Sequence, residues 1–256
     1  MNILLTNDDG IGSKGIQSLF GKLKKEGHNV YVSAPDRGYS CSGQAITVNN
    51  ILRSEKRYIE GEYQNSVKGY PADCIFIAMH SLYKDIKFDF VISGINNGAN
   101  VGYDINYSGT LGAAREAFSY GIPTMAVSFF THNTEADFSV PCDWTVKVLE
   151  KLKDKCSADC LYNLNVPYKT SSEIRGLKIC PMSQVKYFSG IEENTDPYGR
   201  KYYFITGNYN WKLGDRKDAD FLLKNYVTLT PIKIDYSDYD EINRLNNIFF
   251  TEKEEN

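Results

Sequence analysis

The stretch Asn2–Gly15, which reads NILLTNDDGIGSKG, decides how this chain begins to fold. Its first residues, NILLT, form a short apolar run that predicts a β-strand, and apolar residues then recur at helical spacing from Ile16 to Leu23. The stretch therefore predicts a strand that turns directly into a helix. Within the turn, Asp8 and Asp9 stand in front of a glycine-rich segment. One functional interpretation starts from the glycines, and another starts from the aspartates.

The glycines match the fingerprint of dinucleotide-binding folds. Gly10, Gly12 and Gly15 spell G-x-G-x-x-G, and Asp36 follows about 20 residues later, where a ribose-binding acid is expected. In a dehydrogenase, however, the pyrophosphate must approach bare backbone at the first glycine. The aspartate pair occupies that approach here, and a dinucleotide phosphate would meet two negative charges. We therefore interpret the glycines as turn and helix-packing residues.

Beyond this turn, apolar runs alternate with segments of helical spacing along the first two thirds of the chain. Further strands are expected at residues 29–35, 89–96, 124–130 and 161–167, and further helices at residues 71–83, 109–121 and 144–155. Such alternation is typical of parallel sheets that are covered by helices. The sequence therefore predicts the α/β class, with a Rossmann-like parallel sheet and helices on both faces.

The pattern changes after about Pro181. Residues 201–211 and 225–236 are β-rich and punctuated by turn residues, and no helix is expected between them. Residues 238–256 predict a last helix with a charged tail. We therefore divide the chain into a Rossmann-like domain, residues 1–180, and a β-rich extension with a C-terminal helix, residues 181–256. Two or three antiparallel strands are expected in this extension.

Composition and charge exclude several classes of function. The 256 residues carry a net charge of −3, and the basic runs at residues 22–25 and 151–155 are short and mixed with acids, so no nucleic-acid partner is expected. No secretory signal and no apolar run near ~20 residues is present, so we expect no membrane partner. The six cysteines contain no C-x-x-C pair and have no histidine at ligand-like spacing, which indicates reduced thiols in the cytoplasm rather than zinc.

Polar side chains follow the first three predicted parallel strands, at the point where each strand ends. They are Asn7, Asp8 and Asp9 after the first strand; Asp36, Arg37, Ser40 and Ser42 after the second; and Asn96, Asn97, Asn100, Asp104, Tyr107, Ser108 and Thr110 after the third. Ligands bind beyond the carboxyl ends of the strands in open parallel sheets. We expect these side chains to share one rim.

The aspartate pair predicts a metal site on this rim. Two adjacent carboxylates repel each other unless a cation lies beside them. Carboxylate, hydroxyl and amide oxygens favour a hard cation such as Mg²⁺, Mn²⁺ or Ca²⁺. For the motif alone, capping of the first helix by Asp8 and Asp9 is an equal alternative. The polar residues on the other two loops favour the metal.

The segment from Asn96 to Phe118, NNGANVGYDINYSGTLGAAREAF, predicts an anion site. It is rich in glycine and leads directly into a helix, whose first N–H groups can bind phosphate, and Ser108 and Thr110 add hydroxyl donors. The alternative is an ordinary loop with a serine or threonine cap. Beside a dication, such donors could stabilise the charge that develops in phosphoryl transfer.

Other phosphatase and hydrolase mechanisms lack their residues in this sequence. The aspartates form D-D-G instead of the D-x-D of aspartyl-phosphate enzymes, no cysteine begins a phosphate loop that leads to arginine, and no G-x-S-x-G elbow occurs. Water activated by a metal is the nucleophile that remains.

The chain resembles the SurE family of stationary-phase survival proteins, which are metal-dependent nucleotidases. The matching stretches are ILLTNDDGIGSKGI (3–16), VSAPDRGYSCSGQAIT (32–47), KGYPADCI (68–75), DFVISGINNGANVGYDINYSGTLGAAREA (89–117), TDPYGRKYYFITG (195–207) and NYVTLTPIKID (225–235). They occur in the family's order and cover nearly the whole chain. The resemblance implies a Rossmann-like domain whose β-rich extension assembles a homodimer or homotetramer.

The resemblance also implies an activity and a set of site residues. The activity is hydrolysis of nucleoside 5'- and 3'-monophosphates, often with exopolyphosphatase activity, and it depends on one divalent metal, Mg²⁺ or Mn²⁺, whose site Ca²⁺ can occupy. The implied metal ligands are Asp8, Asp9, Ser40 and Asn96. Cys41 and Gln44 depart from the family, which usually has Gly or Ala and His or Asn at these positions. Cys41 places a thiol beside the metal loop.

We expect Asp8 or Asp9 to be the catalytic residue that orients a metal-bound water for in-line attack, and the sequence leaves open which of the two acts. The residues expected to bind phosphate or substrate are Gln44, Asn100, Ser108, Gly109 and Thr110. The alternative function is a non-catalytic sensor that binds a nucleotide or a metal in the same pocket.

Overall fold

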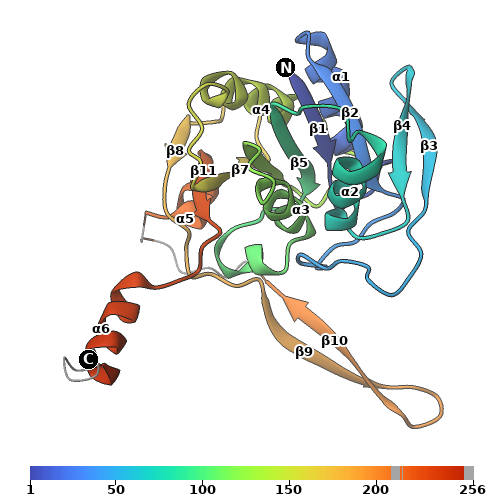
Figure 1. Cartoon of the computed structure of the whole chain (residues 1–256). Coiled ribbons are helices and arrows are strands. Elements are labelled where there is room, and N and C mark those ends of the chain that lie inside the picture. The colour runs from blue at the N-terminus through green and yellow to red at the C-terminus, as the bar shows by residue number, and fades with distance from the viewer. Residues whose placement is uncertain (209–213, 215, 251–256) are drawn as a thin grey trace.

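A nine-stranded sheet forms the body of the protein in the computed structural model, which describes residues 1–208, 214 and 216–250 (Figure 1). The strand order is β3-β4-β2-β1-β5-β6-β7-β11-β8, and β9 and β10 form a separate two-stranded sheet. The strands are β1 (Asn2–Thr6), β2 (Asn29–Pro35), β3 (Ser54–Ile59), β4 (Glu62–Val67), β5 (Phe90–Asn97), β6 (Thr124–Phe130), β7 (Cys160–Pro167), β8 (Leu177–Ile179), β9 (Phe188–Thr195), β10 (Lys201–Gly207) and β11 (Val227–Lys233).

Helices cover both faces of this sheet, as the sequence predicts (Figure 1). They are α1 (Lys14–Lys25), α2 (Pro71–Ile77), α3 (Gly109–Phe118), α4 (Ser139–Leu152), α5 (Asp218–Leu223) and α6 (Tyr239–Phe249), with a π-helical segment η1 (Ala78–Leu82) and a 3-10 helix η2 (Gly102–Asn106). The apolar residues of α1 and α4 pack on one face, and those of α2 and α3 pack on the other.

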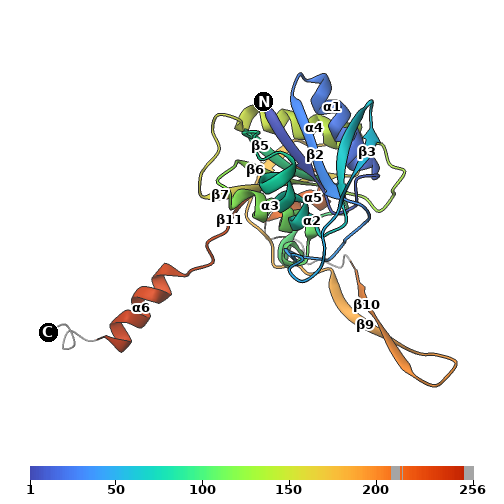
Figure 2. The same ribbon diagram turned by 45° about the vertical axis from the view of Figure 1, so that its right-hand side comes forward.

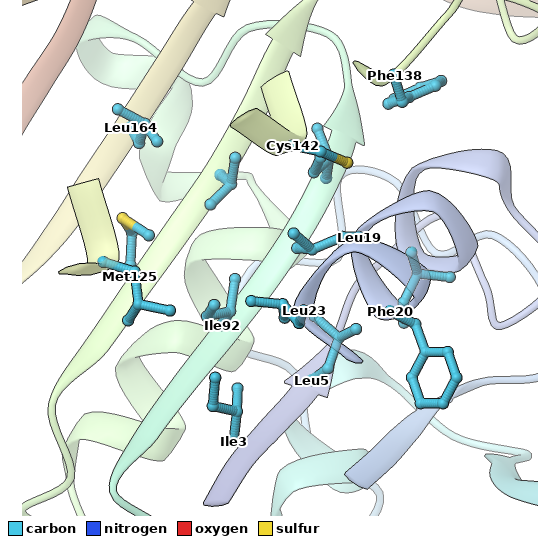
Figure 3. Close-up of a cluster of buried hydrophobic side chains, with 14 of the residues drawn as sticks. Ile3, Leu5, Leu19, Phe20, Leu23, Ile92, Met125, Phe138, Cys142 and Leu164 are labelled. Carbon is cyan, nitrogen blue, oxygen red and sulfur yellow. The ribbon is translucent and has the colours of Figure 1, made fainter. Parts of the chain in front are cut away.

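The alternation of side chains along β1 places the core on both faces of the sheet. Ile3 and Leu5 belong to the cluster that α1 and α4 cover, and Leu4 belongs to the cluster under α2 and α3. Figure 3 shows the first cluster, in which Leu19 and Leu23 of α1 reach toward the sheet. All five side chains have no exposed surface, so β1 is buried on both of its faces.

The order of the strands creates a crevice between β1 and β5. From β1 the chain continues to β2 on one side, and it later returns to β5 on the other side of β1. Both neighbours run parallel to β1. Such a reversal of direction is where open α/β sheets bind ligands. The loops that follow β1, β2 and β5 therefore meet at one rim.

Some elements differ from the sequence-based expectation. β3 and β4 were not predicted, because β3 is almost entirely exposed and carries no apolar run. The helix expected at 144–155 begins at Ser139, five residues earlier, and Pro141 fits its first turn. The helix expected at 71–83 consists of α2 and then η1.

The C-terminal region differs more. β11 lies in the main sheet, antiparallel to β7 and parallel to β8, so the sheet extends across the boundary expected at residue 180. The expectation that no helix lies between the two β-rich segments was wrong, because α5 lies between them. Residues 209–211 of the first segment and 251–256 of the tail lie outside the described residues.

Two elements project from the body in both views (Figures 1 and 2). One is the antiparallel hairpin of β9 and β10, and the other is α6. None of the residues of α6 is buried. Among the described helices, none has both the length and the apolar character needed to cross a membrane.

Replacing Gly15 with alanine should destabilise the fold. The added Cβ would collide with the main-chain carbonyl oxygen of Ile95 on β5, so α1 would have to shift. Such overpacking costs about 1–3 kcal/mol. Gly12→Ala is the matched control from the same motif, because nothing lies within 4 Å of the Cβ that it would add. Urea unfolding measures both variants, and equal midpoints would contradict the close approach of α1 to β5.

Candidate functional site

Asp8 is the buried centre of the rim. It follows β1 and is only 3% exposed. Its main-chain carbonyl accepts a hydrogen bond of 2.7 Å from the N–H of Tyr39, which ties the loop after β2 to the end of β1. Its side chain faces the start of α3, which follows β5 in the chain. One residue thus joins the loops of the three neighbouring strands.

The first turn of α3 holds the Asp8 carboxylate directly. The hydroxyl of Thr110 donates a hydrogen bond of 2.6 Å to Asp8 Oδ1, and neither residue is accessible enough for water to replace it. A Cβ on Gly109 would lie 2.8 Å from the Cβ of Asp8. Glycine is therefore required where the helix approaches the aspartate. Thr110, which the sequence assigned to phosphate, orients Asp8 in this structure.

Asp9 is partly buried and is held from the other side. Its Oδ2 accepts a hydrogen bond of 2.9 Å from the main-chain N–H of Asn97 at the end of β5. It lines a neighbouring hollow together with Ser13 and Lys14. The two aspartates thus lie side by side in the chain, but separate elements fix their carboxylates.

Burial of the two carboxylates makes their negative charge costly. Desolvation, followed by the charge of Asp9, raises the pKa of Asp8 to about 7. Burial likewise raises the pKa of Asp9, and the hydrogen bond from Asn97 offsets this in part. Among the described residues, no lysine, arginine or histidine forms an ion pair with either aspartate. A buried pair without a cationic partner fits a site for a positive ion.

Asp8 lies in the wall of a pocket of about 150 Å³. Four further residues that the sequence assigned to metal or phosphate line the same pocket: Ser40, Asn96, Asn100 and Ser108. The other lining residues are Cys41, Asn97, Ala99, Asp104, Tyr107 and Tyr187. The loops after β1, β2 and β5 therefore meet here, as their positions at the strand ends indicated.

Two asparagines of this pocket are fixed by their neighbours. The amide nitrogen of Asn96 donates to the carbonyl of Gly98 at 2.9 Å, so its amide oxygen is the atom that can bind a cation. The amide nitrogen of Asn100 donates to the hydroxyl of Ser128 at 2.8 Å. One hydrogen of that amide remains as a donor for a ligand.

Ser108 forms the helical end of the pocket. Ser108 is the N-cap of α3, and its Oγ accepts a hydrogen bond of 3.2 Å from the N–H of Leu111. Its own hydroxyl hydrogen is left for a ligand in the pocket. Of the first N–H groups of the helix, those of Leu111 and Gly112 donate to Ser108 itself, which leaves the N–H of Gly109 at the helix N-terminus, where known anion sites lie.

Gln44 lies away from the pocket in this structure. Its side chain is exposed and donates a hydrogen bond of 3.1 Å to Glu116 on α3. Cys41, beside Ser40, is exposed and adopts a positive φ of 58°. Burial and the nearby carboxylates of Asp8 and Asp104 raise the pKa of its thiol.

The donors fit a hard divalent cation. Two carboxylates, the hydroxyl of Ser40 and the amide oxygen of Asn96 supply oxygen ligands only. Within the described ranges, no group of three or more His, Cys, Asp or Glu side chains could hold a metal. A soft or thiolate-bound metal has no comparable site in this part of the chain.

Two residues that fix the main chain of the pocket at Asn100 were not predicted from the sequence. Asn163 and Asn165 of β7 both donate to the carbonyl of Asn100, at 2.8 and 3.0 Å, and the N–H of Asn100 donates to Asn165 Oδ1. The signal was two buried asparagines at alternate positions in the apolar run LYNLNVP. Asn97 was expected on the rim, but its contact with Asp9 uses only the main chain and so could not be predicted from its side chain.

Comparisons with known proteins cover nearly the whole chain. The family model "Survival protein SurE" matches residues 3–189. A protein of Petrotoga mobilis named 5'-nucleotidase SurE is 41% identical over 251 residues, which cover 96% of this chain and 98% of that protein. One of the same name from Clostridium botulinum is 36% identical, over 98% of this chain and all of its own length. The crystal structure of the SurE protein from Aquifex aeolicus matches with a TM-score of 0.84 and 32% identity, over 97% of this chain and 99% of that one.

Replacing Thr110 with valine should lower the free energy of unfolding by about 1–3 kcal/mol, the cost of removing a buried hydrogen bond to a charged group. Thr110→Ser keeps the hydroxyl and should retain most of the stability. Chemical denaturation measures both variants against the unchanged protein. A valine variant as stable as the serine variant would show that this hydrogen bond does not hold Asp8.

Proposed function

This chain belongs to the SurE family, and on that basis we propose that it is a metal-dependent phosphatase that hydrolyses nucleoside monophosphates to nucleoside and phosphate. The relatives named 5'-nucleotidase support the 5'-monophosphates as substrates. Hydrolysis of 3'-monophosphates and of polyphosphate belongs to the same proposal. The observation that carries it is the buried aspartate pair at the β1–β5 crevice, which has no cationic partner among the described residues.

One divalent cation, Mg²⁺ or Mn²⁺, would be held by Asp8, Asp9, Ser40 and Asn96. Two observations support this assignment: the buried aspartates have no cationic partner among the described residues, and the four side chains offer only oxygen atoms as metal ligands. When bound, the cation supplies Lewis-acid stabilisation of the phosphate and lowers the pKa of a water molecule. The hydroxyl of Thr110 would keep Oδ1 of Asp8 in place.

The chain's own residues would bind and orient the substrate. The hydroxyl of Ser108, the amide of Asn100 and the main-chain N–H of Gly109 would donate to the phosphate oxygens that do not react. Gly109 permits this approach, because it has no side chain between the helix and Asp8. Asp8 or Asp9 would accept a hydrogen bond from the attacking water and so align it with the phosphorus.

A homodimer or homotetramer is part of the proposal. The hairpin of β9 and β10 exposes large apolar side chains, among them Ile191, Phe204 and Ile205, and α6 exposes Ile248 and Phe249. Apolar surfaces of this kind mark protein interfaces. A second copy of the chain is the partner that we assign to them.

The six cysteines are free thiols, which fits a location in the reducing cytoplasm.

Phosphate release from AMP tests the proposed activity. Protein treated with EDTA should release none, and added Mn²⁺ or Mg²⁺ should restore release. Asp8→Asn and Asp9→Asn should each lower the restored rate roughly 100-fold or more, because supporting groups alone are worth about 10–100-fold in metal sites. Circular dichroism serves as the folding control for both variants.

Three outcomes would contradict the proposal. Full activity in EDTA would exclude the metal, and near-normal turnover in both asparagine variants would exclude the aspartates. Tight AMP binding without phosphate release would instead favour the non-catalytic sensor.

A further inference from the structure

Asp104 is a second buried carboxylate in the pocket, and the activity proposed above does not use it. It lies in η2, between β5 and α3, and is only 9% exposed. It lines the same pocket as Asp8. Cys41 lines this pocket as well. The pocket thus contains two buried carboxylates.

One oxygen of Asp104 is held by the main chain, and the other has no partner among the described residues. Oδ2 accepts a hydrogen bond of 2.8 Å from the N–H of Tyr187, at the base of the hairpin. Oδ1 is buried and accepts no hydrogen bond from any of the described residues. Burial raises the pKa of Asp104, and the charge of Lys186 offsets this in part. An unpaired buried oxygen of this kind is costly unless a ligand donates to it.

The chemistry of Asp104 excludes the phosphate as its partner. A carboxylate has only acceptor oxygens and repels a phosphate dianion. The phosphate donors lie elsewhere, at Ser108, Asn100 and the start of α3. Asp104 therefore requires a neutral part of the substrate that donates hydrogen bonds. In a nucleoside monophosphate, the ribose hydroxyls lie a few bonds from the phosphate, and carboxylates bind such hydroxyls in other nucleotide sites.

We propose that Oδ1 of Asp104 accepts a hydrogen bond from the ribose hydroxyls of the substrate, so that Asp104 selects ribonucleotides over deoxynucleotides and over phosphate esters that lack a sugar. The inference rests on the proposed nucleotidase function. Tyr107 and Tyr187 line the pocket beside Asp104 and give the sugar an aromatic surface to pack against.

The Asp104→Asn variant separates this role from a structural one. The asparagine carbonyl can still accept from the N–H of Tyr187, whereas its amide group places a donor where the carboxylate oxygen was. Thermal unfolding confirms that the variant is folded. Asp143→Asn is the control, since it neutralises an exposed carboxylate on α4 that pairs with Lys22 far from the pocket.

The experiment compares kcat/KM for AMP, 2'-deoxy-AMP, 3'-deoxy-AMP and p-nitrophenyl phosphate. The unchanged enzyme should prefer AMP over at least one deoxy analogue by roughly 10- to 100-fold, the value of a hydrogen bond to a charged group. Asp104→Asn should lower kcat/KM for AMP by a similar factor. For the disfavoured deoxy analogue and for p-nitrophenyl phosphate, kcat/KM of the variant should stay within about twofold of the unchanged enzyme. The preference should thus disappear in the variant, as a double-mutant cycle requires.

The other results would overturn the inference. An equal loss on AMP and both deoxy analogues, with p-nitrophenyl phosphate unchanged, would make Asp104 a proton donor to the leaving alcohol. Loss of a second Mn²⁺ equivalent in a binding titration of the variant would make it a metal ligand. Unchanged kinetics would leave it a structural residue. If the unchanged enzyme releases phosphate from none of the four compounds, the proposed function fails instead.

Discussion

The burial of the Asp8 carboxylate beside Asp9 is the constraint on which the rest of the site depends. A single buried carboxylate can be neutralised by a proton, and the raised pKa of Asp8, about 7, shows how costly its charge is. The hydrogen-bond donors that keep the pair in place include the hydroxyl of Thr110 on Asp8 and the N–H of Asn97 on Asp9. Neither carries a full positive charge. The geometry is therefore that of a site prepared for a cation.

Close backbone packing makes this geometry possible. α3 can bring its N-terminus to Asp8 because Gly109 and Gly112 have no side chains. A Cβ on Gly109 would meet Asp8, and one on Gly112 would collide with the carbonyl of Gly43 in the loop after β2. The same helix therefore fixes the aspartate, the phosphate donors and the loop that carries Ser40. A change in any one of these contacts would move the others.

The sequence predicted the rim of the site because strand ends can be recognised locally. Runs such as NILLT and DFVISGIN mark the strands, and parallel pairing then places Asp8, Ser40, Asn96, Asn100 and Ser108 at one edge. Contacts between distant side chains were beyond this reasoning. Thr110 turns to Asp8 and Gln44 to Glu116 because of how α3 packs, which no local pattern encodes.

The C-terminal region shows the same limit for the fold. The run of β11 was recognised as a strand, but its partners are β7 and β8, and the choice depends on which edge of the sheet is open after the helices pack. β3 is almost entirely exposed, and the buried residues of β4 are mostly polar, so both strands lack the apolar signal of the central strands. The spacing of apolar residues in the sequence reflects which side chains are buried in an apolar core, so it gives only a weak signal for elements at the surface.

Calorimetric titration of Mn²⁺ into chelated protein tests the central claim most directly, because it measures the aspartate pair without any substrate. The unchanged protein should bind one equivalent, and Asp8→Asn should bind none at the same concentrations. Absence of binding to the unchanged protein, or equal affinity in the variant, would contradict the account of this site.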